Sequence, residues 1–199
     1  EATTKILPET WVFRNKRAPD GSIKKYKARY CVRGDLQEGE RETHALVVAW
    51  TTVRLFVVIA LTLDWVTCSI DFSNAFVQAT LDEAVYIHLP RGFRGSLGVQ
   101  SCLRLKKSLY GLTTAPRLWY EHLFKTYKEL GFKPSRYDPC LLVKQGMMIV
   151  NYVDDQGIAA ARQSDIDDLV KTLQERGFEL TIEGTFEEFL GIQVDRNKT

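Results

Sequence analysis

The chain has 199 residues, of which 45% are hydrophobic and 26% charged, so it resembles a soluble globular protein with a sizeable core rather than a disordered chain. The longest apolar run, residues 55–63, is about half of the roughly 20 residues that a membrane-spanning helix needs. Four widely separated cysteines argue against a zinc site and a disulfide framework, and a net charge of +2 does not by itself indicate a partner.

A basic hairpin is predicted near the start, with strands over residues 11–14 and 23–33 and a turn at 18–21. In the second strand Lys25, Lys27 and Arg29 share one face, and Tyr26, Ala28 and Tyr30 share the other. This concentration of cations suits a polyanion such as nucleic acid or a triphosphate, and a solvated hairpin explains it equally well.

The middle of the chain alternates helices with apolar strands. Thr51 or Thr52 is expected to cap a helix that ends near residue 63, and a buried strand follows over residues 66–72. Residues 73–79 are predicted to begin a helix and residues 84–89 to form a strand. Residues 115–130 form the clearest amphipathic helix, with apolar side chains at helical spacing.

Two strands are predicted over residues 140–143 and 147–153, joined by a turn at residues 145–146. Ser164 is expected to cap a helix that ends near Arg176, and residues 178–182 and 189–194 are predicted as the last two strands. Helices that alternate irregularly with hairpins indicate an α+β architecture rather than a doubly wound parallel sheet.

The strongest chemical signal is an apolar strand, beginning at Met148, that runs into the adjacent carboxylates of Asp154 and Asp155. Neighbouring carboxylates repel one another unless a divalent cation neutralises them, and Mg²⁺ binds carboxylates together with water and phosphate. Asp71 also closes an apolar strand, so two strand ends could present three carboxylates to a pair of metal ions. The alternative is an exposed Asp-Asp turn without a metal.

Seven segments in order resemble the reverse transcriptases of copia-type long-terminal-repeat retrotransposons. They are Tyr26–Tyr30 with Gly34 and Gln37; Val47–Val48 with Thr51–Arg54; Ile70–Phe76; Leu89–Pro90 with Gly92–Phe93; Lys107–Leu112 with Ala115–Arg117 and Trp119–Tyr120; Tyr152–Asp155; and Phe189–Gln193. Each motif alone is weak evidence, whereas the whole series in register is very specific.

The resemblance implies a right-hand polymerase with fingers over residues 1–64 and 80–107 and an antiparallel palm sheet packed on helices over residues 65–79 and 108–199. Asp71, Asp154 and Asp155 would be the catalytic carboxylates that bind two Mg²⁺ ions, with Mn²⁺ as a substitute, and the carbonyl of Phe72 would complete one shell. By this resemblance the chain, which does not begin with Met, would be a fragment without thumb and RNase H.

The resemblance also assigns the substrate contacts. Residues expected to bind the nucleotide are Lys27, Arg29, Phe76, Tyr110 and Gly111, and residues expected to contact nucleic acid are Arg33, Arg117, Tyr152, Leu190 and Gly191. The Phe76 ring would exclude a 2′-hydroxyl, unless it is simply a core side chain. Lys27 and Arg29 would neutralise phosphate charge, unless they are solvated strand cations. Arg117 is equally well interpreted as structural.

The implied reaction is RNA-directed DNA synthesis from a DNA or RNA primer and deoxynucleoside triphosphates. Its expected setting is a cytoplasmic virus-like particle, without a membrane, and the chain would be joined in a polyprotein to thumb, RNase H and integrase. The chain departs from the family pattern at Thr113–Thr114, Leu46 and Gln156, so an inactive transposon relic that folds and binds nucleic acid is one alternative. Another palm-type metal enzyme, such as a DNA-templated polymerase or a nucleotidyl cyclase, is a second.

Overall fold

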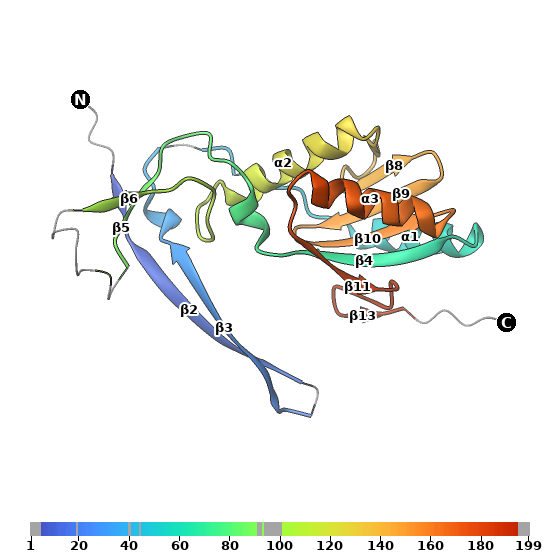
Figure 1. Ribbon diagram of the computed structural model, residues 1–199, viewed down its shortest axis with the longest axis horizontal. Coiled ribbons are helices and arrows are strands. Elements are labelled where there is room, and N and C mark those ends of the chain that lie inside the picture. The colour runs from blue at the N-terminus through green and yellow to red at the C-terminus, as the bar shows by residue number, and fades with distance from the viewer. Residues whose placement is uncertain are drawn as a thin grey trace. The chain divides into compact units, whose positions relative to one another are not determined.

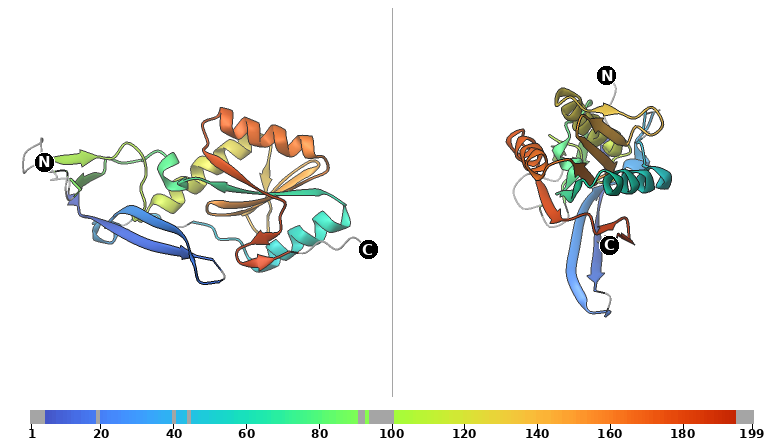
Figure 2. Two further views of the ribbon diagram at one scale, coloured as in Figure 1. Left: turned by 60° about the horizontal axis from the view of Figure 1, so that its bottom comes forward. Right: turned by 90° about the vertical axis from the view of Figure 1, so that its right-hand side faces the viewer.

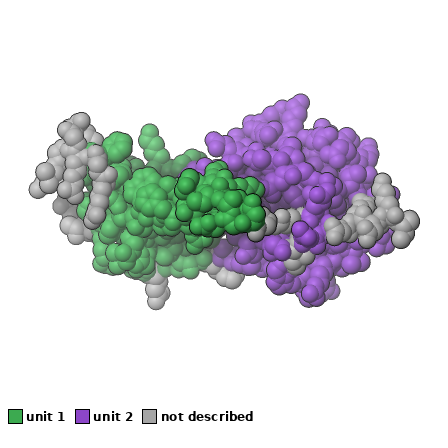
Figure 3. Space-filling view, turned by 90° about the horizontal axis from the view of Figure 1, so that it is seen from below, with its two compact units in different colours: residues 1–44, 79–118 green, residues 45–78, 119–199 purple. Residues whose placement is uncertain are grey.

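The computed structural model describes residues 5–18, 20–39, 41–43, 45–90, 93 and 101–194. The chain forms two compact units: unit 1 comprises residues 1–44 and 79–118, and unit 2 comprises residues 45–78 and 119–199 (Figure 3). Compactness does not identify either unit as fingers or palm, so the predicted ranges stay a prediction. Within the described ranges, no helix combines the length and the apolar character needed to cross a bilayer.

Unit 1 is built from short strands and one long hairpin (Figure 1). The hairpin pairs β2 (Glu9–Arg17) with β3 (Ile23–Val32), and a second sheet has the order β1 (Ile6–Leu7), β5 (Tyr86–His88) and β6 (Cys102–Arg104). A 3-10 turn, η1 (Gly34–Leu36), follows β3. In the hairpin Arg14 is opposite Lys27, whereas Trp11 is opposite Tyr30. Because cross-strand partners share a face, basic and aromatic side chains lie on different faces of the hairpin.

Unit 2 is organised around a six-stranded antiparallel sheet. Its strand order is β11 (Leu180–Gly184), β4 (Val66–Phe72), β10 (Asp155–Ala160), β9 (Met147–Tyr152), β8 (Leu141–Lys144) and β7 (Lys133–Pro134). The small hairpin of β12 (Glu188–Phe189) and β13 (Ile192–Gln193) follows. The helical elements are α1 (Trp50–Thr62), η2 (Ala75–Gln78), α2 (Ala115–Glu129, within unit 2 from Trp119) and α3 (Gln163–Glu175).

The helices of unit 2 sandwich its sheet: α1 lies on one face, and α2 and α3 lie on the other (Figure 2, left). On the α1 face, Val53 and Phe56 join a buried cluster with Val150 and Ala159 of the sheet. On the opposite face, Ile149, Ile158 and other apolar side chains are fully buried. Burial of apolar area on both faces is the main stabilising contribution to the unit and fixes the strand ends that carry the acidic residues.

The predicted caps of two helices are wrong. Helix α1 begins at Trp50, so Thr51 and Thr52 lie inside its first turn. Its cap comes from Asp138, which accepts hydrogen bonds from the Ala49 amide at 2.9 Å and from the Thr52 hydroxyl at 2.6 Å. Helix α3 begins one residue before Ser164, and its N-cap residue, Arg162, makes no side-chain capping bond.

Two further predictions of secondary structure are corrected by the backbone. The stretch 73–79 forms only the 3-10 turn η2, because Asn74 takes a positive φ of 52° and interrupts any α-helix. The strand predicted over residues 189–194 is instead the tip of the β12–β13 hairpin, where Leu190 and Gly191 have φ values of 53° and 79°. Both deviations depend on one or two residues with positive φ, which hydrophobic patterning does not reveal.

Candidate active site

Asp71 and Asp155 are direct partners across the antiparallel pair of β4 and β10. The Phe72 amide donates to the carbonyl of Asp154 at 2.9 Å, which makes Phe72 and Asp154 a hydrogen-bonded position. Because such positions alternate, Asp71 and Asp155 occupy a non-hydrogen-bonded position, where Cα atoms lie about 4.5 Å apart and side chains approach most closely. Two carboxylates distant in sequence therefore meet at one end of the sheet.

Asp154 lies on the two-residue turn between β9 and β10, and we call Tyr152–Asp155 the acidic turn. All three carboxylate residues are partly exposed, so solvent ions reach them. Like charges at directly opposed positions are destabilising, and a divalent cation would remove that repulsion. Among the described residues there is no group of three or more Asp, Glu, His or Cys arranged to hold a metal ion, so the third carboxylate is not gathered with the opposed pair.

The acidic turn carries an unusual backbone conformation. Val153 has a φ of 55°, a region that β-branched residues rarely adopt. Its carbonyl accepts a hydrogen bond of 2.7 Å from the indole nitrogen of Trp119, on α2. Strained backbone of this kind persists only where the surroundings hold it, and it concentrates at functional sites.

A buried polar chain lies directly below the acidic turn. The Tyr127 hydroxyl donates to the side-chain carbonyl of Gln156, whose amide donates to Asn151 at 2.6 Å. Gln156 and Tyr127 are fully buried and Asn151 is 3% exposed. Burial raises the pKa of the Tyr127 hydroxyl well above its usual range, while the hydrogen bond to Gln156 lowers it, so the hydroxyl keeps its proton.

Phe76 lies on η2, four residues after Phe72 in chain order, and is half-buried. The segment around it is tied down by Gln78, whose amide nitrogen donates to the carbonyls of Ser73 at 2.8 Å and Glu179 at 2.9 Å. The Glu179 amide donates back to Gln78 at 3.0 Å. Gln78 therefore fixes the path of the chain immediately after the acidic strand end.

Within unit 1, four of the residues predicted to bind nucleotide or nucleic acid lie close together. The guanidinium of Arg29 lies 5.2 Å from the centre of the Tyr110 ring, a cation–π contact. The Val32 amide donates to the Tyr110 carbonyl at 2.8 Å, and the Gly34 amide donates to the Gly111 carbonyl at 3.2 Å. A Cβ atom on Gly111, which has a φ of 91°, would lie 2.0 Å from the Val32 carbonyl oxygen. This close approach requires glycine.

Lys27 shares the face of β3 with Arg29 and lies opposite Arg14, so the cations form one stripe. Arg33 follows the strand, and its guanidinium forms two hydrogen bonds to Asp35, at 2.8 and 2.7 Å. Lys27, Arg29, Tyr110 and Gly111 thus gather on and beside one strand, and Arg33 stands at its end.

Comparison with known proteins adds an independent finding. The family model for reverse transcriptase (RNA-dependent DNA polymerase) matches residues 2–199. The chain belongs to the reverse transcriptase family. It is 34% identical over 196 residues to the retrovirus-related Pol polyprotein from transposon RE1 of Arabidopsis thaliana, which covers 95% of the chain and 13% of that protein.

Other relatives of this reverse transcriptase domain are also transposon polyproteins. The retrovirus-related Pol polyprotein from transposon TNT 1-94 of Nicotiana tabacum is 30% identical over 197 residues, 95% of the chain and 15% of that protein. The truncated transposon Ty1-A Gag-Pol polyprotein of Saccharomyces cerevisiae is 33% identical over 159 residues, 76% of the chain and 12% of that protein. The chain thus spans under a sixth of the length of these polyproteins.

The reverse transcriptase domain accommodates its three departures from the family pattern. Gln156 is satisfied by Tyr127 and Asn151, although it is buried. The Thr113 hydroxyl bonds to the side chain of Gln37 at 3.2 Å, and the Thr114 carbonyl accepts the first helical hydrogen bond of α2. Leu46 packs against the buried cluster beneath α1. None of these substitutions removes a carboxylate from the acidic strand ends.

The β12–β13 hairpin, which carries Leu190 and Gly191, is anchored by Phe186. The Phe186 ring lies 5.2 Å from Phe56 and 5.0 Å from Phe189, centre to centre. A Cβ atom on Gly157 would lie 2.3 Å from the Phe186 ring, so the ring rests directly on the backbone of β10. Gly157 and Asp155 face the same side of that strand, and Tyr152 packs against the same cluster.

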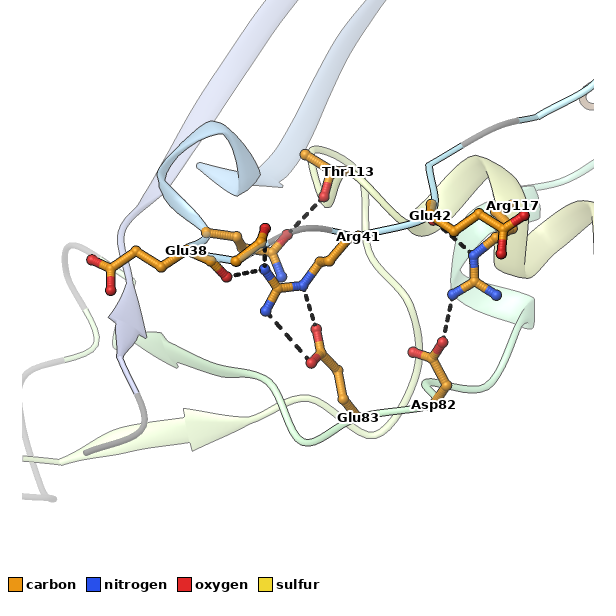
Figure 4. A network of polar contacts seen from close by, with 9 residues as sticks. Glu38, Arg41, Glu42, Asp82, Glu83, Thr113 and Arg117 are labelled. Carbon is orange, nitrogen blue, oxygen red and sulfur yellow. Dashed lines mark hydrogen bonds and ion pairs between the residues drawn. The ribbon is translucent and has the colours of Figure 1, made fainter. Parts of the chain in front are cut away.

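Arg117 is engaged inside unit 1 (Figure 4). Its guanidinium donates to the Glu42 carbonyl at 2.9 Å and forms an ion pair with Asp82, with 14% of the side chain exposed. Arg41 forms another ion pair in the same unit, with Glu83 at 2.8 Å. These contacts give Arg117 a structural role, and its predicted contact with nucleic acid stays a prediction.

The sequence did not predict the hydrogen bonds made by Trp119, Tyr127, Gln78 and Asp138, which reach the acidic turn, Gln156, the segment after β4 and the start of α1. Trp119 belongs to one of the motifs that resemble the family. Nothing in the sequence near it indicates that its indole nitrogen donates to a carbonyl 34 residues away. Asp138 lies 89 residues from the amide it caps. Gln156 offered the one usable signal, since a polar residue on a buried strand requires a polar partner.

Proposed function

We propose that this chain forms the fingers and palm of an RNA-directed DNA polymerase, with fingers over residues 1–64 and 80–107, mostly in unit 1, and palm over residues 65–79 and 108–199, mostly in unit 2. The observation that carries the proposal is the opposed pair of Asp71 and Asp155 beside the acidic turn, in a chain of the reverse transcriptase family. The six-stranded antiparallel sheet with helices on both faces supports unit 2 as the palm. The cationic hairpin supports unit 1 as the fingers.

Asp71 and Asp155 fit a divalent metal, because two carboxylates at opposed strand positions offer oxygen ligands at one end of the sheet. Asp71, Asp154 and Asp155, with the carbonyl of Phe72, would hold two Mg²⁺ ions, which supply Lewis-acid activation of a hydroxyl and neutralise phosphate charge when bound. In the proposed reaction the primer 3′-oxygen attacks the α-phosphorus of a deoxynucleoside triphosphate. The phosphoanhydride bond breaks, pyrophosphate leaves, and the hydroxyl proton passes to solvent.

The substrate contacts follow from unit 1 and η2. Arg29, stacked on Tyr110, presents its charge in a fixed orientation to a triphosphate, and Lys27 adds a second cation on the same face. The approach of the Val32 backbone requires glycine at position 111, so the proposed nucleotide contact of Gly111 would be made by the other side of its backbone. The half-buried ring of Phe76 would exclude a 2′-hydroxyl and so favour deoxynucleotides.

The nucleic-acid contacts would be mainly to phosphates, so template–primer binding should weaken with salt and depend little on sequence. Leu190 and Gly191, at the tip of the hairpin seated on β10, would contact the primer, and Tyr152 and Arg33 would contact the primer–template. The partners are an RNA template, a DNA or RNA primer and the flanking thumb, RNase H and integrase regions of a polyprotein.

The test is primer extension on an RNA template by the full-length Pol protein that contains this chain. We expect Mg²⁺-dependent DNA synthesis that Asp154→Asn abolishes. The matched control is Asp165→Asn, which removes the same charge from the start of α3, where the carboxylate pairs with Arg162, and should leave extension unchanged. Undiminished synthesis by Asp154→Asn contradicts the assignment. Tight template–primer binding without extension by the unaltered protein would instead indicate an inactive relic.

A further inference from the structure

The acidic turn is contacted by a hydrogen bond whose donor is rigidly held. Trp119 donates its indole N–H to the Val153 carbonyl at 2.7 Å. The indole is 1% exposed and packs edge-on against Phe72, with ring centres 5.1 Å apart, and against Phe178, with ring centres 6.1 Å apart. Because the ring cannot change rotamer in this packing, the position of its N–H is fixed relative to β4.

A second contact lies one residue below the acidic turn on each strand. Asn151 precedes Tyr152, and its cross-strand partner Gln156 follows Asp155. The amide of Gln156 joins the two strands at 2.6 Å, and the Tyr127 hydroxyl holds Gln156 from outside the sheet. All three side chains are buried, so a lost partner leaves an unsatisfied polar group rather than one that water can solvate.

Both contacts come from one helix. Trp119 and Tyr127 are eight residues apart on α2, which places them on one face and about 12 Å apart along the axis. The β9–β10 ladder and the Phe72 amide also hold the turn. The two hydrogen bonds from α2 add directional restraints, one at the Val153 carbonyl within the turn and one at Gln156, the residue after it. Displacement of a reacting group by about 1 Å lowers a rate by up to about 100-fold.

We propose that α2 is the element that positions the acidic turn, with Trp119 and Tyr127 as positioning residues for Asp154 and Asp155. The inference rests on the proposed polymerase function. Neither side chain touches the metal or the nucleotide: Trp119 acts through the Val153 carbonyl, and Tyr127 acts through Gln156. The strained φ of Val153 is maintained by the bond from Trp119.

The first test uses Trp119→Phe, which removes the N–H and keeps an aromatic ring, in the full-length Pol protein. We expect kcat for primer extension to fall about 10- to 100-fold, the KM for nucleotide to stay within about twofold, and the Mg²⁺ concentration for half-maximal rate to rise several-fold. The control is Leu123→Ala, which removes buried apolar volume from the same helix without removing a hydrogen bond. It should lower stability and leave the Mg²⁺ dependence unchanged.

The second test measures local opening of the acidic turn by amide hydrogen exchange and does not require polymerase activity. The Phe72 amide donates to the Asp154 carbonyl, and the Ala161 amide donates to Gly146 at the far end of the β9–β10 hairpin. We compare the exchange rate of the Phe72 amide with that of the Ala161 amide. The ratio of the two rates should rise at least about tenfold in Trp119→Phe and Tyr127→Phe. The ratio should not change in Leu123→Ala, because general destabilisation accelerates both amides.

The outcomes separate the two proposals. An unchanged exchange ratio in both variants overturns the positioning role, whatever the activity. An unchanged Mg²⁺ dependence in Trp119→Phe overturns it as well. If the unaltered full-length protein does not extend a primer, the polymerase proposal fails, and the exchange ratio still decides whether α2 holds the acidic turn. If Trp119→Phe does not fold, Tyr127→Phe carries both tests.

Discussion

The cap of α1 by Asp138 offers a quantitative test of the fold that supports the site. The carboxylate accepts hydrogen bonds from the Ala49 amide, the Thr52 hydroxyl and the Cys140 amide, at 2.9, 2.6 and 2.9 Å. Loss of an N-cap costs about 1 kcal/mol, and hydrogen bonds to a charged group contribute about 1.5–3 kcal/mol each but are not additive. We therefore expect Asp138→Ala to lower the free energy of unfolding by about 3 kcal/mol.

In a chain of this length 1 kcal/mol corresponds to roughly 2–4 °C, so Asp138→Ala should lower Tm by about 6–12 °C. Urea denaturation at neutral pH measures the free energy directly, with an unchanged m value as the sign that only stability has changed. Asp165→Asn is the control: its carboxylate makes an exposed ion pair with Arg162, and its loss should cost less than about 1 kcal/mol.

The pKa of the Asp138 carboxyl determines how its contribution to stability changes with pH. Burial raises the pKa of the Asp138 carboxyl, but the hydrogen bonds from Thr52, Ala49 and Cys140 outweigh it and hold the pKa below its ordinary value of 3.8. The stabilisation by the carboxylate is therefore complete above about pH 4 and disappears as the pH falls through the lowered pKa. The stability difference between the unaltered protein and Asp138→Ala should shrink in that acidic range. A difference below about 1 kcal/mol at neutral pH would refute the reasoning.

Three further predictions concern the site residues. Gly111→Ala should destabilise the chain far more than Gly146→Ala in urea denaturation, because both glycines have positive φ but only a Cβ on Gly111 meets backbone; equal losses would contradict this. Mg²⁺ should stabilise the unaltered chain in urea denaturation more than it stabilises Asp155→Asn, since the substitution removes one oxygen ligand of the opposed pair; equal stabilisation would count against a metal site at this pair. Phe76→Ala should raise ribonucleotide incorporation relative to deoxynucleotide incorporation in primer extension, and an unchanged ratio would show that the ring is only a core side chain.

The sequence predicts those elements whose pattern is local. The bounds of β4 match the predicted strand, and α2 lies within one residue of its predicted range, because an apolar run and a strong helical period leave little choice. The alternation along β3 correctly separates the basic face from the aromatic face. The sequence predicted that Asp71 meets both Asp154 and Asp155. The register places Asp71 opposite Asp155, whereas no group of three carboxylates arranged to hold a metal is found among the described residues.

Features that depend on distant residues were not predictable. The cap of α1 comes from Asp138, so the local signal of Thr51 and Thr52 pointed to the wrong helix start. Strand β10 contains Gly157 and two alanines, which have low strand propensity, and it is a central strand because β4 and β9 flank it. The turn at Leu190 depends on a positive φ in a residue that does not favour it.

The most direct measurement is paramagnetic broadening of amide resonances by Mn²⁺, titrated into the chain without nucleic acid. Binding at the proposed centre would broaden the amides of Asp71, Asp154 and Asp155 together, at one Mn²⁺ concentration, and Mg²⁺ would reverse the effect. Asp71→Asn should weaken the broadening at Asp154 and Asp155, although they are far away in sequence. Broadening that spares these three residues, or that persists unchanged in Asp71→Asn, would contradict a metal centre shared by the two strand ends.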